Sequence, residues 1–335
     1  MNARRSLSTA AVAGAAALGL VALSACSGPS GGAEKGEDGK LDVVASFYPM
    51  RFLAEQIGGD KVSVTTLTRP GAEPHDLELK PRQIAELGDA GFVLYLKGLQ
   101  PAVDEAIEQA GVEHTVDAAS LTTLEAHGTH EDHDHGAHEA RTEEPRAGES
   151  GGHDGHDHAS EAGGDPHVWL DPVKYAEIAE GVGDRLAEAD RANAAAYEKN
   201  ADGLAKRLRA LDTRFRDGLK TTATRTFITT HSAFGYLAER YGLDQEGISG
   251  LDPESDPSPA RVKELQGIAK KEKVTTVFFE TLASDRTART LARDTGLRTD
   301  VLDPLEGITE RSKGTDYFEV MEANLAALRK ALGAK

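Results

Sequence analysis

Hydrophobic and polar positions along the chain follow two periods, which predict strands and helices in turn. Short apolar or β-branched runs bounded by glycine, proline or charged residues are typical of strands. Such runs lie at 41–47, 62–67, 92–96, 226–230, 274–279 and 299–302. Apolar residues spaced three and four apart predict helices between them, at 50–57, 81–87, 101–110, 258–269, 284–296 and 317–332. Strands that alternate with helices are typical of an α/β lobe.

The middle of the chain predicts a long helix between two such lobes. Asp171-Pro172 has the residues of a helix start, with Asp as N-cap and Pro at the first helical position. From Asp190 to Leu219 one apolar stripe recurs at helical spacing, formed by Leu204, Leu208, Leu211, Phe215 and Leu219. A helix of that length spans roughly 45 Å. The pattern therefore predicts two α/β lobes joined by a long helix.

The N-terminus has the pattern of an export signal. Arg4 and Arg5 precede an apolar run at 10–23, which is short for a membrane span. The run ends in Leu-Ser-Ala followed by Cys26, the single cysteine of the chain. These residues resemble a bacterial lipobox, which implies lipidation of Cys26 and an anchored, extracytoplasmic protein. The alternative is a plain secretory signal, and one cysteine excludes an internal disulfide.

Composition and length then predict the domain organisation. The 310 residues from Cys26 onward suffice for two lobes with their own cores. The expected parts are a signal peptide at 1–25, a Gly/Ser-rich tether at 26–40, an N-terminal lobe at 41–185 that contains a disordered insertion at 127–165, a linking helix at 186–222 and a C-terminal lobe at 223–335.

Charge narrows the class of partner. The net charge of −18 argues against nucleic acid and against anionic membrane as a binding partner. The segment 127–165 carries eleven Asp and Glu residues against two Arg, a net charge of −9, so half of the excess lies there. A cation is the partner that suits such a segment.

The same segment is rich in histidine. It contains His127, His130, His133, His135, His138, His153, His156 and His158. Neutral imidazole is a ligand for zinc, copper and nickel. Since few apolar residues are present, the segment is expected to bind several ions weakly rather than to fold. The alternative is a solvated acidic loop without a metal role.

Four histidines lie outside that segment. His114 precedes a predicted strand and has a plausible structural role. His75, His167 and His231 lie at strand or loop ends, where ligands bind in α/β sheets. Since 92 and 64 residues separate them, their spacing alone leaves open whether they meet.

The sequences around these three histidines resemble one known family. Pro-Gly-x-x-Pro-His-Asp, Asp-Pro-His-x-Trp-Leu-Asp-Pro and Thr-His-Ser-Ala-Phe-Gly-Tyr-Leu are similar to the signature segments of the zinc and manganese solute-binding lipoproteins of bacterial ABC transporters. The resemblance implies two Rossmann-like lobes with a metal site in the cleft between them, and His75, His167 and His231 as ligands. It also implies Asp303 as a candidate fourth ligand and Glu280 as a supporting residue.

The resemblance implies zinc as the transported ion. Manganese members carry a carboxylate where His231 stands, and three imidazoles with one carboxylate or water suit tetrahedral zinc. A monomer that captures Zn²⁺ and hands it to an ABC permease is therefore expected, without catalysis. Manganese binding, a zinc-dependent hydrolase and an adhesin or sensor are the alternatives, although no H-E-x-x-H or nucleophile-elbow motif is present.

Overall fold

The computed structural model describes residues 33, 35–36, 38–127 and 164–335. These residues belong to one compact unit, Gly32–Lys335. Cys26, the tether up to residue 32 and most of the histidine-rich segment lie outside the described residues. Within the part of the chain that is described, no helix is both long enough and apolar enough to cross a membrane.

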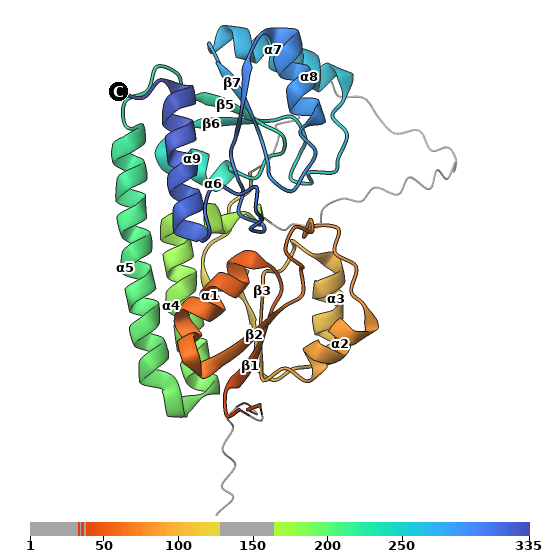
Figure 1. Cartoon of the computed structure of the whole chain (residues 1–335), viewed down its shortest axis with the longest axis vertical. Helices are drawn as coiled ribbons and strands as arrows, with labels where there is room; N and C mark the ends of the chain where they lie inside the picture. Colours follow the sequence, from red (N-terminus) through yellow and green to blue (C-terminus); the bar gives the residue numbers. More distant parts are fainter. Residues whose placement is uncertain (1–32, 34, 37, 128–163) are drawn as a thin grey trace, which may run out of the picture. The chain divides into compact units, whose positions relative to one another are not determined.

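The first lobe is a parallel sheet built from the N-terminal third of the chain (Figure 1). Its strand order is β2-β1-β3-β4. The strands are β1 (Leu41–Ala45), β2 (Val62–Thr66), β3 (Phe92–Tyr95) and β4 (Thr115–Asp117), and the helices are α1 (Tyr48–Gly58), α2 (Pro81–Gly88) and α3 (Pro101–Ala110), with short 3-10 turns η1 (Gly59–Lys61) and η2 (Ala118–Leu121). All three neighbouring pairs are parallel, as the strand–helix alternation requires.

The second lobe repeats this topology with strand order β6-β5-β7-β8, again all parallel. Its strands are β5 (Thr226–Thr229), β6 (Asp244–Gly247), β7 (Thr276–Phe279) and β8 (Arg298–Val301), and its helices are α6 (Gly235–Tyr241), α7 (Pro259–Lys271), α8 (Arg286–Thr295) and α9 (Tyr317–Leu332). The predicted pair of α/β lobes is confirmed.

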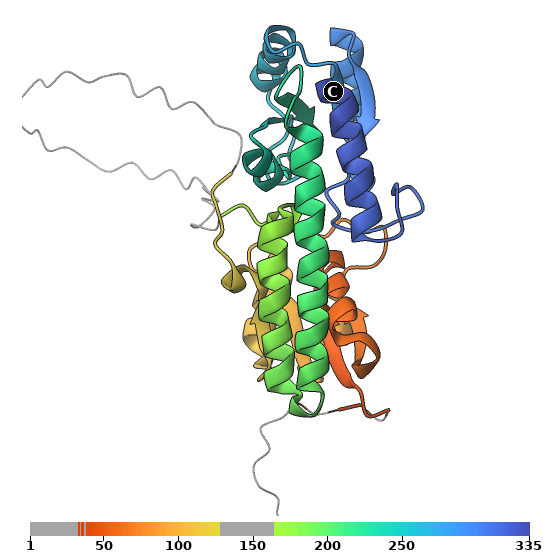
Figure 2. The same cartoon turned by 90° about the vertical axis from the view of Figure 1, so that its left-hand side faces the viewer.

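Two long helices pack side by side, and the second of them runs beside both lobes. After the 3-10 turn η3 (Val168–Leu170), α4 spans Pro172–Ala189 and is capped by the Asp171 carboxylate, which accepts the N–H of Val173. A second 3-10 turn, η4 (Arg191–Asn193), leads into α5 (Ala194–Leu219). Figure 2 shows α5 packed along α4 and, toward its C-terminal end, beside α9. The predicted apolar stripe of α5 is buried along its whole length.

The long helix begins four residues later than the sequence pattern predicted. The carboxylate of Asp190 accepts hydrogen bonds from Asn193 Nδ2 at 2.7 Å and from the Tyr197 hydroxyl at 2.9 Å. Together with the backbone bond from the Asn193 N–H to the Asp190 carbonyl at 3.0 Å, these bonds hold residues 190–193 in a tight turn. The α4 and α5 helices therefore form a hairpin.

The largest hydrophobic core is continuous between the lobes. It includes Phe47 and Phe92 from the first lobe, Trp169 from the segment before α4, and Phe278 and Leu305 from the second lobe. Smaller clusters lie within each lobe. Because the lobes share buried apolar surface, opening them as rigid bodies would expose part of this core to water.

Candidate metal centre

His75 lies in the loop between β2 and α2. The Glu73 carboxylate accepts the backbone N–H of His75 at 3.0 Å, which orders the loop locally. The buried Gln100 carboxamide donates to the Pro74 carbonyl at 3.1 Å and to the Thr68 hydroxyl at 2.9 Å. The loop is thus fixed to the first lobe directly before the histidine.

His167 lies directly before η3 and α4 and is fully buried. One carboxylate oxygen of Asp165 accepts both the backbone N–H of His167, at 2.9 Å, and a contact from ring Nδ1, at 2.7 Å. A carboxylate on Nδ1 favours the tautomer that leaves Nε2 free to bind a cation.

His231 follows β5 and is also fully buried. Its Nδ1 lies 2.6 Å from Oε1 of Glu280, which follows β7 and also accepts the Thr230 hydroxyl. The carboxyl ends of β5 and β7 therefore supply one imidazole and the carboxylate that orients it, at the sheet edge where α/β folds bind ligands. The expectation that Glu280 supports the site rather than faces the ion agrees with this arrangement.

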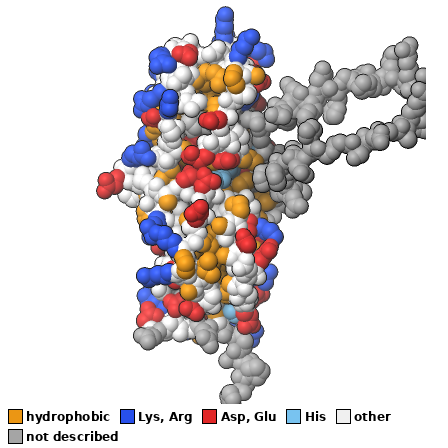
Figure 3. Space-filling view, turned by 90° about the vertical axis from the view of Figure 1, so that its right-hand side faces the viewer, with side chains coloured by type: hydrophobic (Ala, Val, Ile, Leu, Met, Phe, Trp, Pro, Cys, Tyr) orange, Lys and Arg blue, Asp and Glu red, His pale blue; other side chains and the backbone are white. Residues whose placement is uncertain are grey.

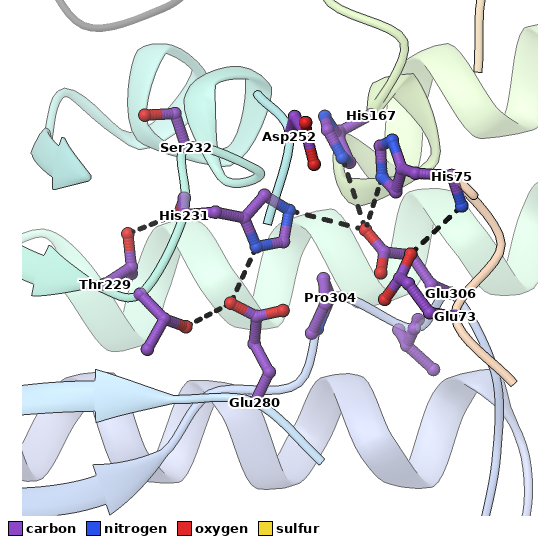
Figure 4. A network of polar contacts seen from close by, with 12 residues as sticks. Glu73, His75, His167, Thr229, His231, Ser232, Asp252, Glu280, Pro304 and Glu306 are labelled. Atoms are coloured by element: carbon purple, nitrogen blue, oxygen red, sulfur yellow. Dashed lines mark hydrogen bonds and ion pairs between the residues drawn. The ribbon is translucent and has the colours of Figure 1, made fainter. Parts of the chain in front are cut away.

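The three imidazoles converge on one carboxylate, that of Glu306 (Figure 4). Oε1 of Glu306 lies 3.3 Å from Nε2 of His75, 3.3 Å from Nε2 of His167 and 3.4 Å from Nε2 of His231. All four ligand atoms lie within 4.8 Å of one another. Among the described residues this is the single group of three or more His, Cys, Asp or Glu side chains arranged closely enough to hold an ion.

The spacing fits a tetrahedral shell. In a tetrahedron the ligand–ligand edge is about 1.6 times the metal–ligand distance, so zinc bonds of about 2.0–2.1 Å give edges of about 3.3–3.4 Å. An octahedral magnesium shell with bonds of the same length has edges of about 2.9 Å. The three distances to Glu306 Oε1 are three of the six edges, and they have the length that tetrahedral zinc requires.

Several buried atoms at this centre lack a well-formed hydrogen bond. They are Nε2 of His167, Nε2 of His231 and Oε2 of Glu306. Buried polar atoms are normally paired, since an unpaired one costs about 1–3 kcal/mol. A cation between these atoms would satisfy them, so the donor set fits a metal ion.

The electrostatics of the centre also favour a positive charge. Burial alone lowers the pKa of His167, but Asp165 and Glu306 raise it to a net value above the ordinary 6.5. The pKa of His231 lies well above its ordinary value, because Glu280 and Glu306 outweigh burial. The pKa of Glu306 lies well below its ordinary value despite full burial, because all three imidazoles contact it.

Access to the centre is from the surface near His75. The His75 side chain is 12% exposed, whereas those of His167, His231 and Glu306 are fully buried. On the face shown in Figure 3, Asp and Glu side chains gather near mid-height. Negative charge on the surface attracts cations.

The structure does not place Asp303 in the cluster, which corrects the expected fourth ligand. Both carboxylate oxygens of Asp303 are used inside the protein: Oδ1 accepts the Leu305 N–H at 2.9 Å and Oδ2 accepts the Thr281 hydroxyl at 3.0 Å. The acid that faces the imidazoles is Glu306, three residues later, which was not among the expected ligands. An Asp before Pro suits an Asx-turn, but the partners that occupy the Asp303 carboxylate are visible only in the fold.

Of the eight histidines in the 127–165 segment, the structure describes one. His127 is described, and its ring contacts Asp165 Oδ2 at 3.1 Å and Glu239 Oε2 at 2.8 Å, outside the central cluster. The other seven histidines of the 127–165 segment lie outside the described residues, as does the lipidation candidate Cys26.

The two parallel-sheet lobes and the buried cluster of three imidazoles and one carboxylate define an α/β ion-binding protein. Residues 43–331 match the model of the family ZnuA, described as zinc-uptake complex component A, periplasmic. The chain belongs to this family, which confirms the resemblance carried by the three histidine motifs.

Curated relatives agree with the family. The chain is 37% identical over 305 residues to the zinc-binding lipoprotein AdcA of Streptococcus pneumoniae, a match that covers 89% of this chain but 57% of that protein. It is 36% identical over 320 residues to the high-affinity zinc uptake system protein ZnuA of Bacillus subtilis, covering 94% and 95%. The chain thus spans little more than half the length of the first relative and nearly all of the second.

A solved structure supports the fold. The Zn(II)-bound ZnuA-like domain of Streptococcus pneumoniae AdcA has a TM-score of 0.68 and 33% identity, over 88% of this chain and 99% of that chain.

Proposed function

We propose that this chain captures extracytoplasmic Zn²⁺ and delivers it to the permease of an ABC transporter. The observation that supports this most directly is the convergence of three Nε2 atoms on one carboxylate oxygen at 3.3, 3.3 and 3.4 Å. In this proposal His75, His167, His231 and Glu306 are the ligands, and zinc is the cargo rather than a resident cofactor.

The donor set favours zinc over manganese. Three imidazoles and one carboxylate form a softer set than the carboxylate- and water-rich sites that suit manganese. The relatives named as zinc-binding or zinc-uptake proteins support the same ion. Manganese remains the alternative cargo.

The same donor set argues against a zinc hydrolase. Catalytic zinc usually has three protein ligands and keeps a fourth position for water or substrate. In this proposal the fully buried Glu306 takes the fourth ligand position, the one that water or substrate holds in a catalytic zinc site. We infer that the protein binds its ion without catalysis.

Lipidation of Cys26 and transfer to a permease complete the proposal. Relatives named as lipoproteins support an anchor on the outer face of the cytoplasmic membrane. A binding protein anchored in the same membrane as its permease has a high effective concentration there, so delivery needs no long diffusion. A monomeric state is expected.

The ligand set is tested by competitive zinc titration against a chelator. Wild-type protein is expected to bind one Zn²⁺ tightly, and His231→Ala and Glu306→Gln are each expected to weaken that binding by at least about 100-fold. The first removes an imidazole from the shell, and the second replaces a charged oxygen ligand with a neutral amide oxygen. Glu239→Gln, which alters an exposed acid outside the cluster, is the control and should leave the tight site unchanged. Wild-type affinity in both ligand variants would refute the assignment.

A further inference from the structure

Glu306 lies in a turn rather than in a helix or strand, so something else must hold its side chain against the imidazoles. The chain leaves β8 at Val301 and reaches Glu306 through Leu302, Asp303, Pro304 and Leu305. Leu302, Asp303 and Leu305 are all buried, with exposed fractions of 0–2%. Solvent therefore does not compete with the hydrogen bonds that shape this turn.

The Asp303 carboxylate makes the bonds that close the turn. Oδ1 accepts the N–H of Leu305, an Asx-turn that fixes the backbone just before Glu306. Oδ2 accepts the hydroxyl of Thr281, which follows β7 and the His231 partner Glu280. One side chain therefore connects the segment that carries Glu306 to the segment that orients His231.

The backbone of Asp303 is anchored as firmly as its side chain. The buried Asn324 of α9 accepts the Asp303 N–H at 2.9 Å and donates to the Asp303 carbonyl at 2.7 Å. The Trp169 indole N–H donates to the Pro304 carbonyl at 2.7 Å. Trp169 lies two residues after His167, so the same turn is also linked to the segment that carries a second imidazole.

The conformation of Leu305 shows that the turn is held rather than merely allowed. Leu305 has a φ of 62°, in the left-handed region that L-residues other than glycine, asparagine and aspartate seldom adopt. Such a conformation persists where the surroundings over-determine it. The Asx-turn from Asp303 and the full burial of the Leu305 side chain are the interactions that do so here.

We propose that Asp303 is a positioning residue that sets the fourth metal ligand by holding the 303–306 turn in its left-handed form. This inference rests on the proposed function, in which Glu306 binds the ion. Asp303 itself does not touch the ion. It presets Glu306 so that the carboxylate pays little ordering entropy when zinc binds, as residues behind metal ligands do in general.

The test compares three substitutions at and around this turn in the full chain. Asp303→Ala removes both bonds and is expected to weaken zinc binding roughly 10–100-fold, the usual effect of losing a residue that orients a ligand. Asp303→Asn keeps an oxygen for the Leu305 N–H and an amide that can donate to the Thr281 hydroxyl, so it should retain nearly wild-type affinity. Asp212→Ala removes a buried carboxylate of α5 outside the cluster and controls for general destabilisation.

Cobalt(II) supplies a readout that destabilisation alone would not move. Tetrahedral Co²⁺ absorbs visible light far more strongly than five- or six-coordinate Co²⁺. The wild type, Asp303→Asn and Asp212→Ala should give the strong tetrahedral spectrum, and Asp303→Ala a weaker or shifted one. If Asp303→Ala does not fold, Thr281→Val, which removes one bond to Asp303, decides: a several-fold loss of zinc affinity supports the inference and no loss overturns it.

The outcomes separate this inference from the proposed function. Wild-type affinity and cobalt spectrum in folded Asp303→Ala, with weak binding in Glu306→Gln, would overturn the positioning role and leave the ligand set intact. Wild-type affinity in Glu306→Gln would remove Glu306 from the site, and the positioning role would fall with it.

Discussion

At the residue scale, each buried imidazole of the centre is held from behind by a carboxylate. Asp165 contacts Nδ1 of His167 and Glu280 contacts Nδ1 of His231, while Nε2 of each ring faces Glu306. His75, the partly exposed ligand, has only a backbone restraint from Glu73. The two buried rings are therefore preoriented, and His75 is the ligand nearest to solvent.

These carboxylates predict how zinc binding depends on pH. The pKa values of His167 and His231 lie above 6.5 in the metal-free protein. As pH falls, both imidazoles therefore take up protons before pH 6.5 is reached, and zinc must displace these protons to bind. Zinc affinity should thus fall as pH decreases, by about tenfold per pH unit for each proton displaced. The ionised Glu306 should not contribute, since its pKa is lowered.

Competition titrations between pH 8 and pH 5.5, corrected for protonation of the chelator, measure this slope. Glu280→Gln removes the charge beside His231 and should shift the fall in affinity to lower pH. An affinity that stays constant over the whole range would contradict the assignment of imidazole ligands.

The sequence predicted the histidines of the site but not its acid, for a physical reason. Strand-end histidines in distinctive motifs are visible in sequence because the motif and the ligand coincide. The choice between Asp303 and Glu306 depends on which carboxylate is consumed by the turn between them, and that depends on Thr281 and the Leu305 N–H. A single sequence does not show partners that fold in from 22 residues away.

At the element scale, apolar periodicity predicted most strands and helices, and two exceptions lack a hydrophobic pattern for separate reasons. The strand β6 has the sequence Asp-Gln-Glu-Gly and lies at the edge of its sheet, so neither its composition nor its burial gives a strand pattern. The helix α6 has seven residues, too few to show helical periodicity. By contrast, α9 spans Tyr317–Leu332, as its apolar spacing predicted.

The α4–α5 hairpin allows a matched test of how closely its helices approach. A Cβ at Gly183 of α4 would lie 2.5 Å from the Ala201 Cβ of α5, whereas a Cβ at Gly203 would meet nothing within 4 Å. Gly203→Ala should raise the free energy of unfolding by about 0.5–1 kcal/mol, because alanine is the better helix former. Gly183→Ala should lower it by about 1–2 kcal/mol, since overpacking outweighs that gain.

Denaturant unfolding of the two variants beside the wild type measures both changes. Zinc affinity should remain unchanged in both, because neither glycine lies in a segment that carries a ligand. Equal stabilisation by the two substitutions would show that α4 and α5 do not touch at Gly183.

At the scale of the whole molecule, the fold is a duplicated lobe with one shared centre. The two sheets have the same strand order, and each lobe contributes side chains to the cluster: His75 from the first, His231 and Glu306 from the second, with His167 from the segment before α4. A continuous core already joins the lobes, so release of the ion is expected to involve the His75 loop more than a wide opening of the lobes.

Two expected parts of the protein lie outside the described residues: Cys26 with its tether, and most of the histidine-rich segment. The two ends of the histidine-rich segment lie beside the metal centre, since Asp165 at its C-terminal end contacts both His127 at its N-terminal end and His167. A segment attached there would release captured ions within reach of the ligands. The segment should therefore increase zinc uptake when zinc is scarce. The proposed anchor should increase delivery to the permease at every zinc concentration.

Growth of a zinc-uptake mutant in zinc-poor medium tests this division. The wild-type chain should restore growth, and His231→Ala should not.

Deletion of 128–163 should restore growth only at higher added zinc, because the tight site remains while local collection of zinc is lost. Cys26→Ala should be exported without a lipid, since the acylated atom is absent, and restore growth poorly at every zinc concentration. Full rescue by Cys26→Ala would contradict the proposed anchor, and equal rescue by the deletion at the lowest zinc would contradict a collecting role for the segment.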